Sequence, residues 1–163
     1  MKTKRYLLRV SICFLCLFCL SSCKKKLDQE EYFKKYILDP IPKSVKNIKV
    51  DQTIRYYGYG YLFGFDINRE DLNLIINSKS LKKITHVGYS NGYLNLEYNN
   101  DPGGIILPVY GNMKAAQWFD PESWINPDCY SYIKMINHQN DFRILLFNAE
   151  ENKAYFYIER SRD

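Results

Sequence analysis

The chain has 163 residues, five cysteines and a formal net charge of +5. Four of its 23 basic residues but none of its 18 acidic ones lie in the first nine positions. The rest of the chain is therefore close to neutral, and this balance argues against a nucleic-acid partner. The length suits one domain with a single hydrophobic core.

The N-terminal segment has the organisation of a secretory signal. Its basic start is followed by an uncharged, almost wholly apolar run from Val10 to Leu20. Such a run is too short to cross a bilayer, which takes about 20 residues in a helix. The run is closed by the tetrad Leu20, Ser21, Ser22 and Cys23. This tetrad resembles the lipobox of bacterial lipoproteins.

The resemblance implies cleavage before Cys23 and acylation of Cys23. Residues 1–22 are then a lipoprotein signal peptide, 23–44 a lipidated basic tether with a short helix, and 45–163 a single globular domain. Each buried methylene contributes about 0.8 kcal/mol, so two or three acyl chains would hold the protein on a membrane. The residue after Cys23 is Lys24 rather than Asp, which resembles the outer-membrane sorting pattern of enteric lipoproteins. We expect a lipid-anchored protein of the cell envelope, in the outer membrane, on its periplasmic or surface face.

The remaining cysteines do not suggest a disulfide framework. Cys13, Cys16 and Cys19 lie within the signal segment, which leaves Cys129 as the one free thiol of the mature domain. Cys129 opens a predicted strand, and residues 138–141 form the predicted turn after it. A nucleophilic thiolate needs a base within hydrogen-bond reach. We therefore expect Cys129 to be a structural thiol rather than the partner of His138 in a protease.

Capping residues and periodicity predict the elements in chain order. Asp28, with Glu31 three residues later, predicts a helix from Asp28 to Leu38. Asn68 predicts the N-cap of a second helix over Arg69–Asn77. Asn91-Gly92 predicts a hairpin turn. Predicted strands cover 45–50, 56–66, 81–89, 93–98, 105–110, 130–136, 142–147 and 154–159, with loops at 99–104 and 111–126 and one helical turn entered at 120–121.

These elements predict an α+β domain. Most strands follow one another through short turns, and no repeat of βαβ length occurs, so a doubly wound parallel sheet is not expected. The prediction is an antiparallel sheet of about six to eight strands, with one or two helices packed on one face.

The aromatic residues are the candidates for binding. Successive strand side chains point to opposite faces, so Tyr57 to Phe65 predicts an aromatic ladder on one face and glycines on the other. The ladder is either core beneath the helices or a binding surface. The glycines either let another backbone or an aromatic ring of the next strand approach closely, or mark bulges and bends. Tyrosine and tryptophan suit sugars and protein partners. The candidate binding residues are Trp118, Phe119, Trp124, Tyr57, Tyr59 and Tyr61.

The sequence offers little for catalysis or cofactors. His86 and His138 are too isolated to predict a metal site, and residues 66–77 lack the glycine and glutamate of a calcium loop. Loop carboxylates around Asp101 and from Asp120 to Asp128 could form the pair that a glycan hydrolase needs. We expect no catalytic residue, metal or cofactor.

In layout the chain resembles the small lipoproteins of Gram-negative bacteria. We expect a non-catalytic module that binds an envelope protein or glycan, with the membrane contacted through lipid on Cys23. The alternatives are an envelope glycan or peptide hydrolase that uses the loop carboxylates, and an inhibitor or immunity-type protein.

Overall fold

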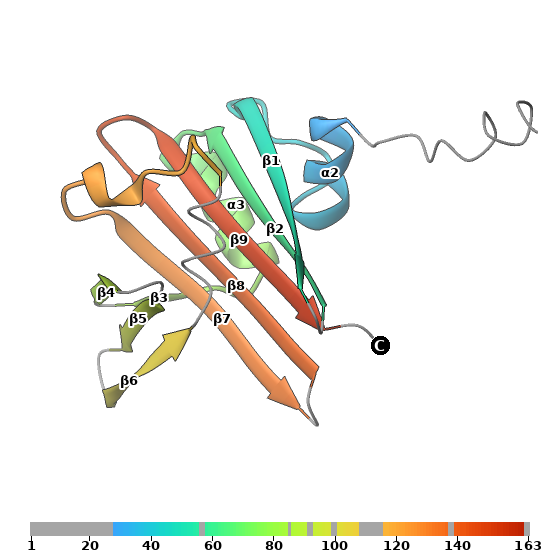
Figure 1. Cartoon of the computed structure of the whole chain (residues 1–163). Helices are drawn as coiled ribbons and strands as arrows, with labels where there is room; N and C mark the ends of the chain where they lie inside the picture. The colour runs from blue at the N-terminus through green and yellow to red at the C-terminus, as the bar shows by residue number, and fades with distance from the viewer. Residues whose placement is uncertain are drawn as a thin grey trace, which may run out of the picture.

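The structure is a computed structural model that describes residues 28–55, 58–84, 86–90, 93–98, 101–107, 116–136 and 139–161. Cys23 and the rest of residues 1–27 lie outside the described residues, so the signal peptide and lipid anchor stay predictions. The described chain has an α+β fold with a six-stranded antiparallel sheet and two helices (Figure 1). The predicted fold class is confirmed.

The main sheet has the strand order β1-β2-β9-β8-β7-β3, and every pair of neighbours is antiparallel. Alternating side chains give each strand one row on either face of the sheet. In β9, Phe156 and Ile158 lie in the core on one face, whereas Tyr155 and Tyr157 lie in the core on the other. The strands are β1 (Lys46–Arg55), β2 (Gly58–Asp66), β3 (Lys82–Ile84), β7 (Asp128–Ile136), β8 (Gln139–Asn148) and β9 (Lys153–Ser161).

Two helices, α2 (Gln29–Tyr36) and α3 (Arg69–Ser78), cover one face of this sheet. Both begin where the sequence predicts. The carboxylate of Asp28 accepts a hydrogen bond from the backbone N–H of Glu31 at 2.7 Å, and the Asn68 side chain accepts one from Asp71 at 2.8 Å. These bonds satisfy donors that lack a partner within the helix. The core beneath the helices includes Phe33, Phe63, Phe65, Leu72, Ile75, Phe147 and Phe156.

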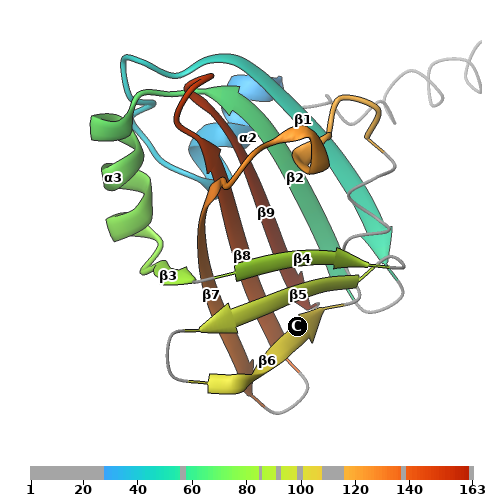
Figure 2. The same ribbon diagram turned by 90° about the vertical axis from the view of Figure 1, so that its left-hand side faces the viewer.

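The other face of the main sheet is covered by different chain segments. Residues 116–127, with the short 3-10 helix η1 (Pro121–Ser123), pack on it. A second, three-stranded sheet has the order β4-β5-β6 and consists of β4 (His86–Ser90), β5 (Tyr93–Tyr98) and β6 (Asp101–Leu107). Figure 2 shows these strands crossing in front of the main sheet, with α2 behind it. The sheet is thus sandwiched between helices and β structure.

Several predicted strand boundaries are wrong. Strand β1 ends at Arg55, five residues beyond the predicted end at Val50. The predicted strand over 81–89 is two strands in different sheets, because β3 pairs with β7 and β4 pairs with β5. Strand β6 begins at Asp101, inside the predicted loop, and β8 begins at Gln139, inside the predicted turn. Both strands extend into polar residues because strand pairing uses backbone N–H and C=O groups, which polar side chains leave available. The hairpin prediction is consistent with Ser90 lying opposite Tyr93; Asn91 and Gly92 lie outside the described residues.

Candidate functional site

The aromatic ladder of β2 is part of the core on the helix side. The side chains of Phe63 and Phe65 are buried, and the ring of Tyr61 stacks on Tyr36 of α2 with centroids 4.2 Å apart. The Tyr61 hydroxyl accepts hydrogen bonds from the Tyr36 hydroxyl at 3.0 Å and from Gln52 at 3.3 Å. Tyr61 is therefore engaged in docking the helix. Tyr57 and the side chain of Tyr59 lie outside the described residues.

The three candidates from the loop lie on the opposite face. Phe119 and Trp124 are 6% and 8% exposed and belong to the core, whereas Trp118 is partly buried at its edge. Trp124 stacks on Tyr155 at 4.4 Å and 5°, and Phe119 meets the same ring edge-on at 4.9 Å. Two of the three rings are thus used for internal packing. Trp118 is the one best placed to meet a ligand.

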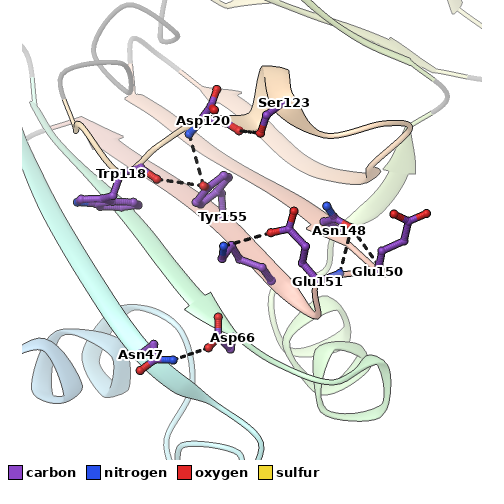
Figure 3. Close-up of polar contacts among 10 residues, drawn as sticks. Asn47, Asp66, Trp118, Asp120, Ser123, Asn148, Glu150, Glu151 and Tyr155 are labelled. Atoms are coloured by element: carbon purple, nitrogen blue, oxygen red, sulfur yellow. Dashed lines mark hydrogen bonds and ion pairs between the residues drawn. The ribbon is translucent and has the colours of Figure 1, made fainter.

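Tyr155 is the residue around which this loop is built, and sequence analysis missed it. Its hydroxyl donates a hydrogen bond to the Trp118 carbonyl at 3.0 Å and accepts one from the Asp120 N–H at 3.4 Å. In Figure 3, dashed lines join the Tyr155 hydroxyl to both residues. Burial raises the pKa of Tyr155 and outweighs the hydrogen bond from Asp120, which lowers it. The phenol stays neutral and able to donate to Trp118.

A cavity of about 640 Å³ opens beside Trp118. This volume is within the range of about 300–1,000 Å³ that is typical of small-molecule sites. Its walls come from the ends of β1, β2 and β9, from α2 and from the loop. The lining residues are Gln29, Asn47, Ile48, Lys49, Gly64, Phe65, Asp66, Trp118, Lys153 and Tyr155.

Gly64 is what allows Trp118 to lie against β2. A Cβ atom on Gly64 would be 2.7 Å from Cζ3 and 3.0 Å from Cε3 of the Trp118 ring. Real Cβ atoms do not approach so closely, so a side chain here would displace the indole. The glycine row of β2 was expected to admit a close neighbour or to mark bulges and bends. At this position it admits Trp118, which comes from the loop rather than from the next strand.

Polar side chains form the rim of the cavity. Asn47 has a positive φ of 52° next to a register shift between Lys46 and Lys49. A bulge of this kind redirects side chains, and asparagine tolerates the left-handed conformation. The Asn47 amide donates a hydrogen bond of 2.6 Å to Asp66 (Figure 3). The bulge therefore coincides with an amide–carboxylate pair at the mouth of the cavity.

The β8–β9 hairpin supplies the cationic part of the rim. The Asn148 side chain accepts hydrogen bonds from the N–H groups of Glu150 and Glu151, which orders the turn. Glu151 then accepts a hydrogen bond of 3.1 Å from Lys153. This bond raises the pKa of Lys153, against an opposing effect of burial. Lys153 is charged but already paired.

The loop carboxylates do not form an acid–base pair at this cavity. Asp128 lies between Arg69 and Lys83 and forms ion pairs with both. Burial alone raises the pKa of Asp128, but the hydrogen bonds and charges of the two cations outweigh it and lower the pKa. A general acid needs a raised pKa, so Asp128 is unsuited to that role. Asp66 is the one carboxylate among the residues that line the cavity. Asp120 is exposed, and the side chain of Asp101 lies outside the described residues.

Cys129 is a buried structural thiol, as expected. It is 5% exposed, and its Sγ donates a hydrogen bond to the Pro127 carbonyl at 3.3 Å. Burial raises the pKa of Cys129 to about 12. A thiol with this pKa is almost wholly protonated at neutral pH and is a poor nucleophile. His138 lies outside the described residues.

We expect Cys129 in the folded protein to resist iodoacetamide at pH 8. An unfolded thiol has a pKa of about 8.5, so burial should slow alkylation on the order of a thousandfold. Mass spectrometry of the peptide that contains Cys129 measures the rate separately from other cysteines. The same peptide from protein unfolded in guanidinium is the control. Equal rates in the two samples would show that Cys129 is accessible.

Within the described part of the chain, no three His, Cys, Asp or Glu residues gather in a way that could hold a metal ion. The helices described are also too short or too polar to cross a membrane. In comparisons with known protein families, curated proteins and solved structures, the chain matches none of them. The site must therefore be interpreted from its own geometry.

Proposed function

We propose that this protein is a non-catalytic binding module, anchored by lipid on Cys23 in the bacterial cell envelope. The observation that carries the proposal is the cavity beside Trp118. It combines an indole ring, an amide, a carboxylate and ammonium groups, the mixture of apolar and polar groups found in binding sites. Asp66 is the one carboxylate among its lining residues, whereas a glycan hydrolase uses two that flank the bond it cleaves.

The proposed anchor supports an envelope partner because of where the cavity lies. Gln29 lines the cavity and is the first residue of α2. It is the sixth residue after Cys23 along the sequence, and a chain extends at most about 3.5 Å per residue, or roughly 20 Å here. A lipid on Cys23 would therefore keep the cavity close to the membrane surface. The partner is then an envelope protein or glycan, in our proposal at the outer membrane.

Metabolic labelling with palmitate tests the anchor. We expect the wild-type chain to take up label and to sediment with membranes, and Cys23→Ala to do neither. Two or three acyl chains bind membranes far more strongly than one, so the difference should be nearly complete. Unlabelled wild-type protein would contradict the anchor.

Site-specific photo-crosslinking in the same cells tests the cavity. A photoreactive amino acid at Lys49, an exposed lining residue, should form an adduct with an envelope component. The same amino acid at Leu74, which is 51% exposed on α3, is the control and should not give this adduct. Adducts that are identical at both positions would show that the cavity is not the binding site.

A further inference from the structure

We propose that the cavity beside Trp118 binds an uncharged sugar unit, with the indole as its apolar platform. This inference rests on the proposed binding function and names its ligand class. Three features of the described residues lead to it. They are a fixed aromatic ring, an amide–carboxylate pair that lines the same cavity, and a balance of charge around the opening.

The Trp118 ring is held in place before any ligand arrives. Its indole lies on the backbone of Gly64, with Cζ3 within 2.7 Å of a hypothetical Cβ. The backbone carbonyl of Trp118 accepts the hydrogen bond from the Tyr155 hydroxyl, and the centroids of the two rings are 6.1 Å apart. A flat ring with restricted rotamers loses little entropy when a ligand binds. The C–H face of a sugar ring is apolar and flat enough to cover such a surface.

The Asn47–Asp66 pair supplies the complementary polar groups. The two side chains are joined by one hydrogen bond of 2.6 Å. A carboxylate has two oxygens with several acceptor sites, and an amide both donates and accepts. The pair can therefore form additional hydrogen bonds with neighbouring hydroxyl groups, each of which also donates and accepts. An apolar ligand would leave these polar groups without compensation for lost water.

The charge around the cavity favours a neutral ligand. Lys49 and Lys153 are the two cations of the lining, and Asp66 is its carboxylate. Glu151 adds a second anion through its ion pair with Lys153. A phosphate or polyanion site needs more cationic donors than anions. At this rim the two lysines are balanced by two carboxylates. A polyhydroxylated, uncharged ring meets the requirements of both the indole and the polar pair.

The test is a titration of the full chain with three uncharged disaccharides: N,N′-diacetylchitobiose, cellobiose and maltose. The protein should be held in a detergent without a sugar head group, such as lauryldimethylamine oxide, so that the detergent does not compete. Two-dimensional NMR resolves the indole N–H resonances of the two tryptophans. We expect at least one disaccharide to shift the Trp118 resonance with a Kd of about 1 mM or tighter. The buried Trp124 should shift less.

Two variants locate the binding. Trp118→Ala, followed through the backbone amide resonance of Gly64 in the cavity wall, and Asp66→Ala should each weaken binding about tenfold or more, as expected for central contacts of a binding site. Because Trp118 also packs on Gly64, circular dichroism must show that its variant is folded, and Asp66→Ala provides an independent measurement. Leu74→Ala, on the exposed side of α3, is the matched control and should bind like the wild type.

The sugar proposal is overturned if none of the three disaccharides shifts the Trp118 indole resonance at concentrations up to about 10 mM, which is well above the expected Kd. It is also overturned if both cavity variants bind unchanged, or if inorganic phosphate binds and the disaccharides do not. The crosslink at Lys49 separates these failures from failure of the binding function. A specific crosslink without sugar binding would leave the binding module in place and remove the sugar.

Discussion

Replacing Tyr155 by alanine is expected to lower the free energy of unfolding by about 3–5 kcal/mol, the range for removal of a buried aromatic side chain. A domain of this kind has about 5–15 kcal/mol in total, so the loss would be a large part of its stability. The reason is the number of groups that depend on this side chain. Its ring contacts Trp118, Phe119 and Trp124, and its hydroxyl bonds the loop backbone at two points. Guanidinium denaturation followed by tryptophan fluorescence measures the change.

Tyr155→Phe is the matched control because it removes only the hydroxyl. Loss of this group leaves the Trp118 carbonyl and the Asp120 N–H without their partner, which should lower the free energy of unfolding by about 1–2 kcal/mol. The tryptophan environment should also change more with alanine than with phenylalanine. If alanine lowered stability no more than phenylalanine does, the ring would not be the support of the loop.

Local sequence signals predicted the helices well. The caps at Asp28 and Asn68 depend on a side chain and a backbone group three residues apart, so a short stretch of sequence contains all the information needed. The face of β2 that carries Phe63 and Phe65 follows from strand alternation alone. What alternation could not decide was whether this face is core. That depended on α2, whose Phe33 contacts both rings.

Long-range pairing explains what the sequence did not predict. The alternating pattern over 81–89 would be the same for one strand or for two, because alternation gives no information about which strands pair with the segment. The partners β7 and β5 lie in different sheets, and this divides the segment. The second sheet was missed for the same reason.

The cavity was also out of reach of the sequence. Asn47, Asp66, Trp118 and Lys153 come from four separate segments, and none of them has a spacing that points to the others. The row of glycines in β2 was the nearest available signal. It predicted close approach at Gly64 but not which ring would approach. Tyr155 had no distinguishing signal, since it is one of 15 tyrosines in the chain.

Helix α2 connects the proposed anchor with the cavity, and its position depends on a few aromatic contacts. It has eight residues, and isolated helices shorter than about 12–15 residues are marginal in water. Its stability must therefore come from docking. Phe33 is fully buried, with its ring 5.1 Å from Phe65 and 6.4 Å from Phe63, edge-on in both cases. Tyr36 adds the stack on Tyr61 and a hydroxyl–hydroxyl bond of 3.0 Å.

Phe33→Ala should undock α2 and lower stability by about 3–5 kcal/mol. Amide hydrogen exchange in residues 29–36 should accelerate more than exchange in β8 and β9, because the helix is peripheral and the strands are central. Tyr36→Phe removes one hydroxyl and should lower stability by only about 1 kcal/mol. Protection of the helix amides that survives Phe33→Ala would mean that other contacts hold the helix.

If α2 does undock, residues 24–38 become a tether of up to roughly 50 Å, and Gln29 leaves the cavity. The lipid-anchored variant should then lose the Lys49 crosslink while it stays on the membrane, which would separate positioning of the cavity from anchoring of the chain.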